Sequence, residues 1–189
     1  MHVPGLHVVF PSTPHDAKGL LKTAIRDPNP VIFLEHKKLY NHKGPVPEEE
    51  YLIPFGAAQN VRPGDDVTVV AIGYMVPLAL EVARELSDQG LEVEVIDPRT
   101  LAPLDVETIF ESVRKTHKVV IAAEDCRTAG PTAEVAALVG ETCFEYLDAP
   151  IGRVGARHAP IAHNVGMSEY LVPGTSEIRA AIESVIDWE

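Results

Sequence analysis

Short apolar runs alternate along the chain with segments whose apolar residues recur every three or four positions. From residue 67 onward this alternation occurs four times, so four buried strands are predicted, each followed by an amphipathic helix. The strands are expected at 67–73, 91–98, 118–125 and 151–156, and the helices at 75–90, 103–116, 130–147 and 175–189. Residues 67–189 therefore predict an α/β domain, in which helices cover both faces of an open, mostly parallel sheet to give three layers.

A strand–helix–strand unit is also predicted near the N-terminus. Two apolar runs, 6–10 and 31–35, flank a segment with one apolar helical face. Ser12 or Thr13 can cap this helix, and the prolines of the sequence RDPNP must end it. One helix and two strands would leave a sheet edge and a helix face uncovered, so we interpret residues 1–40 as the C-terminal remnant of a larger domain.

The segment between these units, residues 41–66, is rich in proline, glycine and charged residues. It is expected to be a linker that crosses between domains, with one short strand at YLIPFG, residues 51–56.

Composition narrows the range of partners and compartments. The net charge is −12 and the pI is about 5.1, so the chain has no general attraction for nucleic acid or for an anionic membrane. No apolar run is long enough to span a membrane, and the N-terminus lacks the pattern of a signal peptide. Cys126 and Cys143 form no CxxC pair, so neither a disulfide framework nor a zinc site is indicated. A cytoplasmic location is expected, or the mitochondrial matrix in a eukaryote.

Residues at the ends of two predicted strands are candidates for chemistry. Gly73 lies between a strand and a helix, where α/β folds bind phosphates, although a single glycine also suits a plain turn. Glu124, Asp125 and Arg127 follow another strand. The two carboxylates suit acid–base work, and the alternative is an Arg127 salt bridge at a strand end or domain interface. The two histidines of the loop RHAPIAHN likewise indicate either a site or a surface loop.

The sequence AIRDPNP places several oxygen atoms in one tight turn. A helix that ends there leaves the carbonyls of Ala24 and Ile25 free, and Asp27 and Asn29 add side-chain oxygens. Such turns bind hard cations, so these four residues are a candidate cation site, and the alternative is a plain helix stop.

The predicted C-terminal helix carries a group of acidic residues and a tryptophan at its end: Glu183, Asp187, Trp188 and Glu189. Acidic residues at a helix C-terminus oppose the helix dipole, and an exposed tryptophan often anchors an interface. A docking surface for a basic partner is one interpretation, and a solvated face with a packed tryptophan is the other.

Two long stretches of the chain resemble a known family. HVPGLHVVFPSTPHDAKGLLKTAIRDPNPVIFLEHKKLY closely resembles the beta subunit of the thiamine-diphosphate-dependent, decarboxylating component of 2-oxo acid dehydrogenase complexes, which include pyruvate, branched-chain and acetoin members. VTVVAIGYMVPLALEVARELSDQGLEVEVIDPRTLAPLDVETIFESVRKT resembles the C-terminal, transketolase-like domain of that subunit. The resemblance implies that residues 1–40 end a pyrimidine-binding domain and that residues 67–189 form a transketolase C-terminal-like domain.

The resemblance also implies which parts of the full assembly carry catalysis, cofactor binding and subunit contacts. The family's cofactor-activating glutamate, its stacking aromatic and a catalytic histidine lie upstream of HVPGL, so no catalytic or cofactor-binding residue is carried over. Thiamine diphosphate and Mg²⁺ are expected only in the full assembly. The turn of Ala24, Ile25, Asp27 and Asn29 matches the family's monovalent-cation site, which implies K⁺. The implied partners are an alpha subunit, a second beta subunit and a lipoyl acyltransferase core, whose small basic domain suits the acidic C-terminal helix.

Two main hypotheses follow. The first is a C-terminal part of such a beta subunit, inactive alone, which contributes assembly contacts, a cation turn and a docking surface to the oxidative decarboxylation of pyruvate-like substrates or acetoin. The second is a free-standing transketolase C-type interaction module without catalysis. A nucleotide-binding domain is a third interpretation, and it rests on Gly73 alone.

Overall fold

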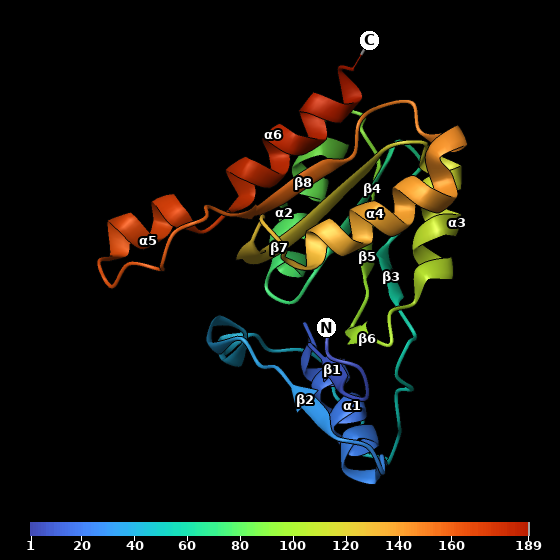
Figure 1. The fold of residues 1–189 in the computed structure, drawn as a ribbon, viewed down its shortest axis with the longest axis vertical. Helices are drawn as coiled ribbons and strands as arrows, with labels where there is room; N and C mark the ends of the chain where they lie inside the picture. Colours follow the sequence, from blue (N-terminus) through green and yellow to red (C-terminus); the bar gives the residue numbers. More distant parts are fainter. Residues whose placement is uncertain (189) are drawn as a thin grey trace.

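The computed structural model describes residues 1–188, which form two β-sheets and the helices that cover them (Figure 1). The larger sheet has five strands in the order β3-β5-β4-β7-β8, and the smaller has three in the order β2-β1-β6. Within this range, none of the helices combines the length and the apolar character that a bilayer crossing requires.

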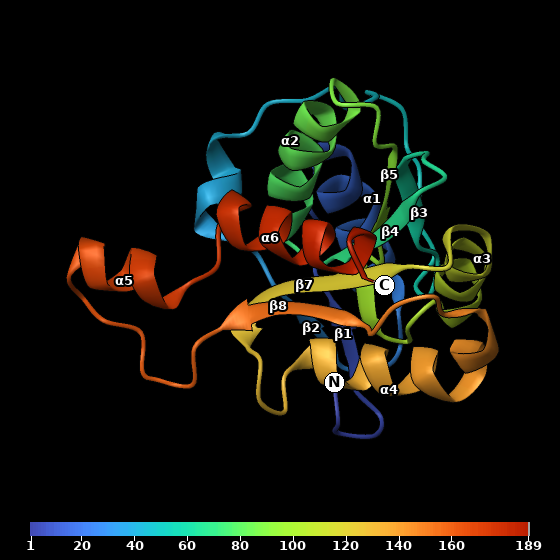
Figure 2. The same ribbon diagram turned by 90° about the horizontal axis from the view of Figure 1, so that it is seen from above.

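The larger sheet is built from the apolar runs predicted as strands. Its parallel strands are β4 (Val67–Ala71), β5 (Val93–Asp97), β7 (Val119–Cys126) and β8 (Gly152–Ala156), and β3 (Gln59–Arg62) adds an antiparallel edge. One face packs against α2 (Met75–Ser87) and α6 (Thr175–Ile186), the other against α3 (Val106–Thr116) and α4 (Pro131–Cys143), as Figure 2 shows. All residues of β4 and β5 are buried because helices cover both faces. The predicted three-layer α/β arrangement is confirmed.

The smaller sheet combines segments from both predicted units. β1 (His7–Val9) and β2 (Val31–Phe33) are parallel and are connected by α1 (Pro14–Arg26), as predicted. Thr13 caps α1, because its hydroxyl oxygen accepts the N–H of Asp16 at 3.1 Å. The third strand, β6 (Thr100–Ala102), follows β5 in the chain and pairs antiparallel with β1. β1 is therefore paired on both sides, and β2 and β6 are the edge strands of this sheet.

The segment between the sheets differs from the prediction in its local structure. No strand forms at 51–56, so that expectation was wrong. This stretch lies along α1, where the Thr23 hydroxyl donates to the Ile53 carbonyl at 2.7 Å. The Ile53 side chain is 6% exposed and joins the apolar core beneath α1, so packing on a helix, not pairing with a strand, stabilises the stretch. A 3₁₀ helix, η1 (Lys37–Asn41), precedes it.

The C-terminal part adds an arm that the apolar periodicity did not indicate. Residues 157–174 leave the carboxyl end of β8 and carry α5 (Val165–Leu171), which projects from the body of the protein in both views (Figures 1 and 2). Val165, Met167 and Tyr170 on α5 are all more than half exposed. The arm therefore presents apolar side chains to solvent.

Two helix ends also differ from their predicted positions. α4 ends at Cys143, and a short 3₁₀ helix, η2 (Phe144–Tyr146), replaces its predicted last turn. Thr175 and Ser176 are favoured capping residue types at the predicted start of α6, but its N-cap is Gly174. The reason is that the Glu177 carboxylate accepts the Gly174 N–H at 2.8 Å and so satisfies the free end of the helix.

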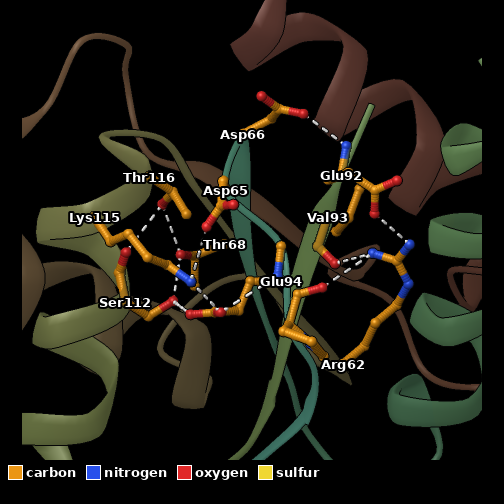
Figure 3. A network of polar contacts seen from close by, with 12 residues as sticks. Arg62, Asp65, Asp66, Thr68, Glu92, Val93, Glu94, Ser112, Lys115 and Thr116 are labelled. Carbon is orange, nitrogen blue, oxygen red and sulfur yellow. Dashed lines mark hydrogen bonds and ion pairs between the residues drawn. The ribbon is translucent and has the colours of Figure 1, made fainter. Parts of the chain in front are cut away.

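A buried polar network at the amino ends of β4 and β5 holds α3 onto the larger sheet (Figure 3). The carboxylate of Glu94, which is 2% exposed, accepts bonds from the Lys115 ammonium and the Ser112 hydroxyl of α3. The Thr68 hydroxyl of β4 lies 2.6 Å from Ser112 Oγ and 2.7 Å from Thr116 Oγ1. Burial alone would raise the pKa of Glu94, but the bonds from Lys115 and Ser112 outweigh it and lower the pKa. The network is a structural contact, at the sheet edge opposite to the one where α/β folds bind ligands.

Replacing Lys115 by methionine should lower the free energy of unfolding by roughly 2 kcal/mol, because it leaves the Glu94 carboxylate buried without its cation. Urea unfolding followed by circular dichroism measures this. Lys118→Met is the matched control, since Lys118 joins the network only through its backbone carbonyl. Equal losses in the two variants would contradict the assignment.

The effect of Lys115→Met should also depend on pH. Because the folded-state pKa of Glu94 is lowered, its contribution is present above the ordinary value of 4.5 and is lost as the pH falls through the folded value. The difference between the wild type and Lys115→Met should therefore shrink when unfolding is measured below pH 4.5.

Candidate functional site

The carboxyl ends of β4, β5 and β7 face the smaller sheet, so the edge at which α/β folds bind ligands is occupied by another part of this chain (Figure 1). Gly73 follows β4 with φ of +59°, a conformation that glycine adopts readily. A Cβ at Gly73 would lie 2.6 Å from the ring of Phe10, which comes from the end of β1. Gly73 therefore makes the turn and admits the Phe10 ring. This packing removes the support for phosphate binding at Gly73, and with it the nucleotide-binding interpretation.

Buried charged and polar groups join the smaller sheet to the end of β5. The carboxylate of Asp16 on α1 is 1% exposed and pairs with the Arg99 guanidinium at 2.9 Å. The Ser12 hydroxyl donates to Asp97 at the end of β5, and the Arg99 N–H donates to the other Asp97 oxygen at 2.8 Å. The Thr13 hydroxyl completes the set by donating to Asp16 at 2.6 Å. Two buried carboxylates and one guanidinium thus form the contact between the two units.

The environment of Asp97 changes its titration. Burial raises the pKa of Asp97 from 3.8 to about 6, and the nearby Asp16 adds to the rise. The bonds from Ser12 and from the Arg99 backbone oppose the rise without cancelling it. A carboxyl of this kind could act in proton transfer, but it is enclosed by the contact that it helps to form. We therefore regard it as part of the contact between the two units.

A second polar contact lies at the carboxyl end of β7. Glu124 pairs with His36, which precedes η1, and the His36 ring stacks on the Tyr74 ring with centroids 4.7 Å apart. The expected Arg127 salt bridge does not form among residues 1–188, and Glu124 contacts the His36 ring instead. Asp125 accepts the N–H of Cys126 at 2.6 Å, so the two carboxylates are not arranged as a catalytic pair.

The oxygen-rich turn at the end of α1 forms as expected. Asp27 is the C-cap, and its Oδ1 accepts both the backbone N–H of Asn29 at 2.8 Å and the Asn29 side-chain amide at 2.9 Å. The first of these bonds lowers the pKa of Asp27, so the carboxylate is charged at neutral pH. The second Asp27 oxygen lies 3.5 Å from His7 Nδ1, which has no hydrogen-bond partner.

The donor set of this turn fits a cation that binds oxygen. The carbonyl of Ala24 has no i+4 donor, because Pro28 lacks an N–H, and the donor that would serve Ile25 is the Asn29 N–H, which bonds to Asp27 instead. Two carbonyl oxygens, the second Asp27 oxygen and the Asn29 amide oxygen are thus the candidate ligands. Within residues 1–188, no three His, Cys, Asp or Glu side chains cluster as a metal site, so any cation here relies on backbone oxygens.

The predicted docking residues lie at the end of α6, apart from the sites above. Glu183 makes only a long i,i+4 pair with Arg179, at 3.8 Å, and Asp187 is the C-cap of the helix. Trp188 is 55% exposed and lines a groove of about 510 Å³ together with Phe144, which is 77% exposed. Glu189 lies outside the described residues. Glu183 is exposed, and Trp188, further along the chain, presents an aromatic surface.

Sequence reasoning missed the residues that join the two units. Asp16 lies in the first turn of α1, where an acidic residue suits the helix dipole without any partner, and His36 carried no local signal of pairing. The two histidines of the loop RHAPIAHN lie exposed on the arm, which favours the surface-loop alternative. A signal for Arg99 existed in the sequence DPRT after a buried strand, since polar residues at that position face the sheet edge.

Comparisons with protein families match both units. The family described as "Transketolase, C-terminal domain" matches residues 56–178, and "Transketolase, pyrimidine binding domain" matches residues 1–43. Both matches agree with the resemblance stated for the two sequence stretches.

Individual relatives give the same result. The chain is 46% identical over 176 residues to the acetoin:2,6-dichlorophenolindophenol oxidoreductase subunit beta of Bacillus subtilis (strain 168), covering 93% of this chain and 52% of that protein. It is 46% identical over 184 residues to the pyruvate dehydrogenase E1 component subunit beta of Rickettsia felis (strain ATCC VR-1525 / URRWXCal2), covering 97% and 56%. The chain thus spans about half the length of the curated relatives it matches.

A solved structure titled "Split gene transketolase, inactive beta4 tetramer" has the same fold. It superposes with a TM-score of 0.81 at 26% identity, covering 99% of this chain and 60% of that chain.

Replacing Asp97 by asparagine should change how stability depends on pH. Because the folded-state pKa of about 6 exceeds the unfolded value of 3.8, the Asp97 carboxyl favours folding at low pH, and this contribution is lost as the pH rises through 6. The unfolding free energy of the wild type relative to Asp97→Asn should therefore rise by roughly 2 kcal/mol from pH 7 to pH 4. Urea titrations at the two pH values measure it.

Asp88→Asn, at the exposed C-cap of α2, gives the baseline for removing a surface carboxyl. A wild-type advantage over Asp97→Asn that falls or stays constant toward pH 4 would show that Asp97 is not held in an environment that disfavours its charge.

Proposed function

The chain belongs to the family of transketolase C-terminal domains, and on this premise we propose that it is the C-terminal part of a beta subunit of a thiamine-diphosphate-dependent 2-oxo acid or acetoin dehydrogenase. In such an assembly thiamine diphosphate with Mg²⁺ would supply the decarboxylation chemistry, on substrates such as pyruvate or acetoin. None of residues 1–188 is assigned to that chemistry. This chain would contribute sheet contacts, a cation turn and a docking surface.

The observation that carries the proposal is the open edge that β2 forms in the smaller sheet. β2 pairs with β1 on one side only, and its burial is incomplete, with Ile32 45% exposed. A three-stranded sheet with such an edge invites a further strand. Leu34 beyond β2 and Ile25 on α1 are 38% and 75% exposed, so apolar surface continues around this edge. The N-terminal half of a related beta subunit would cover it.

The contact between the two units supports the same proposal. β6 and Arg99 from one unit hold β1 and Asp16 of the other, so the smaller sheet is preformed and its open edge has a fixed position. A preformed edge loses less conformational entropy when a partner strand is added. The chain is thus suited to accept a further strand beside β2 in the smaller sheet.

The turn of Ala24, Ile25, Asp27 and Asn29 is the proposed K⁺ site. Its oxygens come from one turn of the backbone and from two side chains, and the carboxylate supplies one negative charge for a monovalent ion. The bound ion would tie the end of α1 to the start of β2 and so stiffen the segment that presents the open edge.

The proposed partners divide between the two ends of the protein. The alpha subunit and the rest of a beta subunit would meet the smaller sheet, and a second beta subunit would meet the larger domain. A lipoyl acyltransferase core would dock at the end of α6, where Trp188 and Phe144 offer an aromatic groove and Asp187 a negative charge. Glu183, exposed on the same helix, would add a second carboxylate to this docking surface.

The chain alone should give no acetoin- or pyruvate-dependent reduction of dichlorophenolindophenol in thiamine diphosphate and Mg²⁺. Activity should appear when an alpha subunit and the N-terminal half of the Bacillus subtilis relative are added, because that half would pair with β2. A spectrophotometric dye assay with each component omitted in turn measures this.

Ile32→Asp should reduce the restored activity at least tenfold, since it places a charge on the open edge without disturbing a buried residue. Phe144→Asp is the matched control, because Phe144 is exposed at the far end of the protein and the dye assay bypasses an acyltransferase. Turnover by the chain alone would contradict the proposed division of function, and restored activity that is indifferent to Ile32→Asp would contradict the role of β2.

Potassium should stabilise the protein through the turn at the end of α1. Replacing 100 mM choline chloride by 100 mM KCl should raise the melting temperature by about 3 °C, the shift expected for a site with a dissociation constant near 10 mM. Asp27→Ala should abolish the K⁺-dependent rise. Differential scanning calorimetry measures both.

The control for Asp27→Ala is Asp88→Ala, which removes an aspartate from the C-cap of α2 at the same kind of position. It should keep the full K⁺ response. A response that survives Asp27→Ala, or that 100 mM LiCl reproduces equally, would contradict a K⁺ site at this turn.

A further inference from the structure

A cavity of about 560 Å³ opens at the carboxyl ends of β7 and β8, between these strand ends, the arm and α6. It lies at the outer side of the sheet, where Figures 1 and 2 show the arm leaving β8. This cavity is separate from the cation turn, from the Phe10–Gly73 packing and from the groove at Trp188. The carboxyl edge of a parallel sheet is the usual position of a ligand site in α/β folds.

Three arginines line this cavity and two of them are held in place. Arg153 on β8 is half-buried, and its guanidinium donates to the Arg127 carbonyl and to Thr132 Oγ1, the latter at 3.3 Å. Arg157, just after β8, donates from Nε to the Tyr170 carbonyl at 3.1 Å and stacks 4.2 Å above the Tyr170 ring. Arg127 follows β7 and lines the same cavity. A carbonyl and a hydroxyl thus fix the position of Arg153, and a carbonyl and an aromatic ring fix that of Arg157.

The Glu177 carboxylate lies near one of these three charges: the Gly174 N–H lowers its pKa most, and the charge of Arg157 contributes to the lowering. Four of the nine arginines in the chain, Arg26, Arg62, Arg99 and Arg179, form ion pairs. Among residues 1–188, the three that line this cavity form none. The carboxylate of Glu177 also lines the cavity, but its Oε2 accepts the Gly174 N–H at 2.8 Å and the Ser176 hydroxyl at 2.9 Å. Three arginines against one carboxylate give this cavity an excess of positive charge, in a chain whose net charge is −12.

The guanidinium groups of Arg153 and Arg127 repel each other, and this repulsion affects the pKa of Arg153. Burial lowers the pKa of Arg153, and the positive charge of Arg127 lowers it further. Keeping two guanidinium groups close without a counterion costs free energy, which an anion placed between them would return.

The rest of the lining is mixed, with Thr128, His158 and Tyr170 among several apolar residues. Val154, Ala156, Val172 and Pro173 line it beside the arginines. An occupant can therefore contact both guanidinium groups and aliphatic side chains. Guanidinium groups suit phosphate oxygens, which they can bind through paired hydrogen bonds.

We propose that this cavity binds a small organic anion that carries a phosphate group beside an apolar portion. Arg153 and Arg157 bind the phosphate, Arg127 adds charge from the neighbouring strand end, and the aliphatic side chains accept the apolar portion. The volume of about 560 Å³ is in the range of small-molecule sites. The proposal is independent of the function proposed above and would stand if that function failed.

Isothermal titration calorimetry of the full chain with phenyl phosphate at low salt tests the proposal. The wild type should bind, and Arg153→Met and Arg157→Met should each weaken binding at least tenfold. Inorganic phosphate should bind more weakly than phenyl phosphate, because it lacks the apolar portion, and phenol should show no binding. Arg84→Met is the matched control, since Arg84 is an exposed arginine on α2 outside this cavity.

Two checks keep the result interpretable. Arg157 is exposed, so its variant should keep the circular dichroism spectrum and melting temperature of the wild type even if Arg153→Met does not. Sedimentation velocity shows whether the arginines instead contact acidic groups of a second copy. The proposal is overturned if the wild type does not bind phenyl phosphate, if Arg157→Met binds it equally well, or if the variants change only the sedimentation coefficient.

Discussion

The contact between β1 and β6, together with the buried Asp16–Arg99 pair, is the constraint on which the N-terminal part of the fold depends. Three strands of three residues each and a single 13-residue helix bury too little surface to fold alone. Asp16 is almost fully buried, and a buried carboxylate needs a paired cation. Arg99 provides it from the segment between β5 and β6, where Asp97 holds its backbone. The smaller sheet therefore exists because the larger domain supplies one strand and one charge.

Because of this constraint, the amino ends and the carboxyl ends of the strands in the larger sheet have different roles. At the amino ends of the strands, Glu94 and its partners lock α3 in place, so this edge is closed and structural (Figure 3). At the carboxyl ends of the central strands, the Phe10 ring against Gly73 and the His36–Glu124 pair seat the smaller sheet. What remains open is the outer edge at β2 and the outer strand ends of β7 and β8. The proposed functions, completion of a sheet and binding of an anion, are located at these two open places.

The sequence predicted the parts of the fold that depend on local signals and missed those that depend on distant contacts. The long apolar runs and helical stripes predicted the four strand–helix pairs, since their periodicity is a property of neighbouring residues. β6 and β3 were missed because strands of three and four residues carry too short a pattern, and β3 has the largely polar sequence QNVR. The residues of the cation turn could be named together because they are contiguous. The Asp16–Arg99 pair and the three arginines of the cavity could not, because tertiary packing alone brings them together.

Amide hydrogen exchange of the chain on its own tests the central claim most directly. The claim is that the smaller sheet is held by the larger domain as a preformed unit, with β2 as an unpaired edge. It requires the amides that pair β1 with β6 to exchange as slowly as those between β4 and β5, since both then open only with global unfolding. Amides of β1 that exchange orders of magnitude faster than those of β4 would contradict it, because the smaller sheet would then melt separately from the domain.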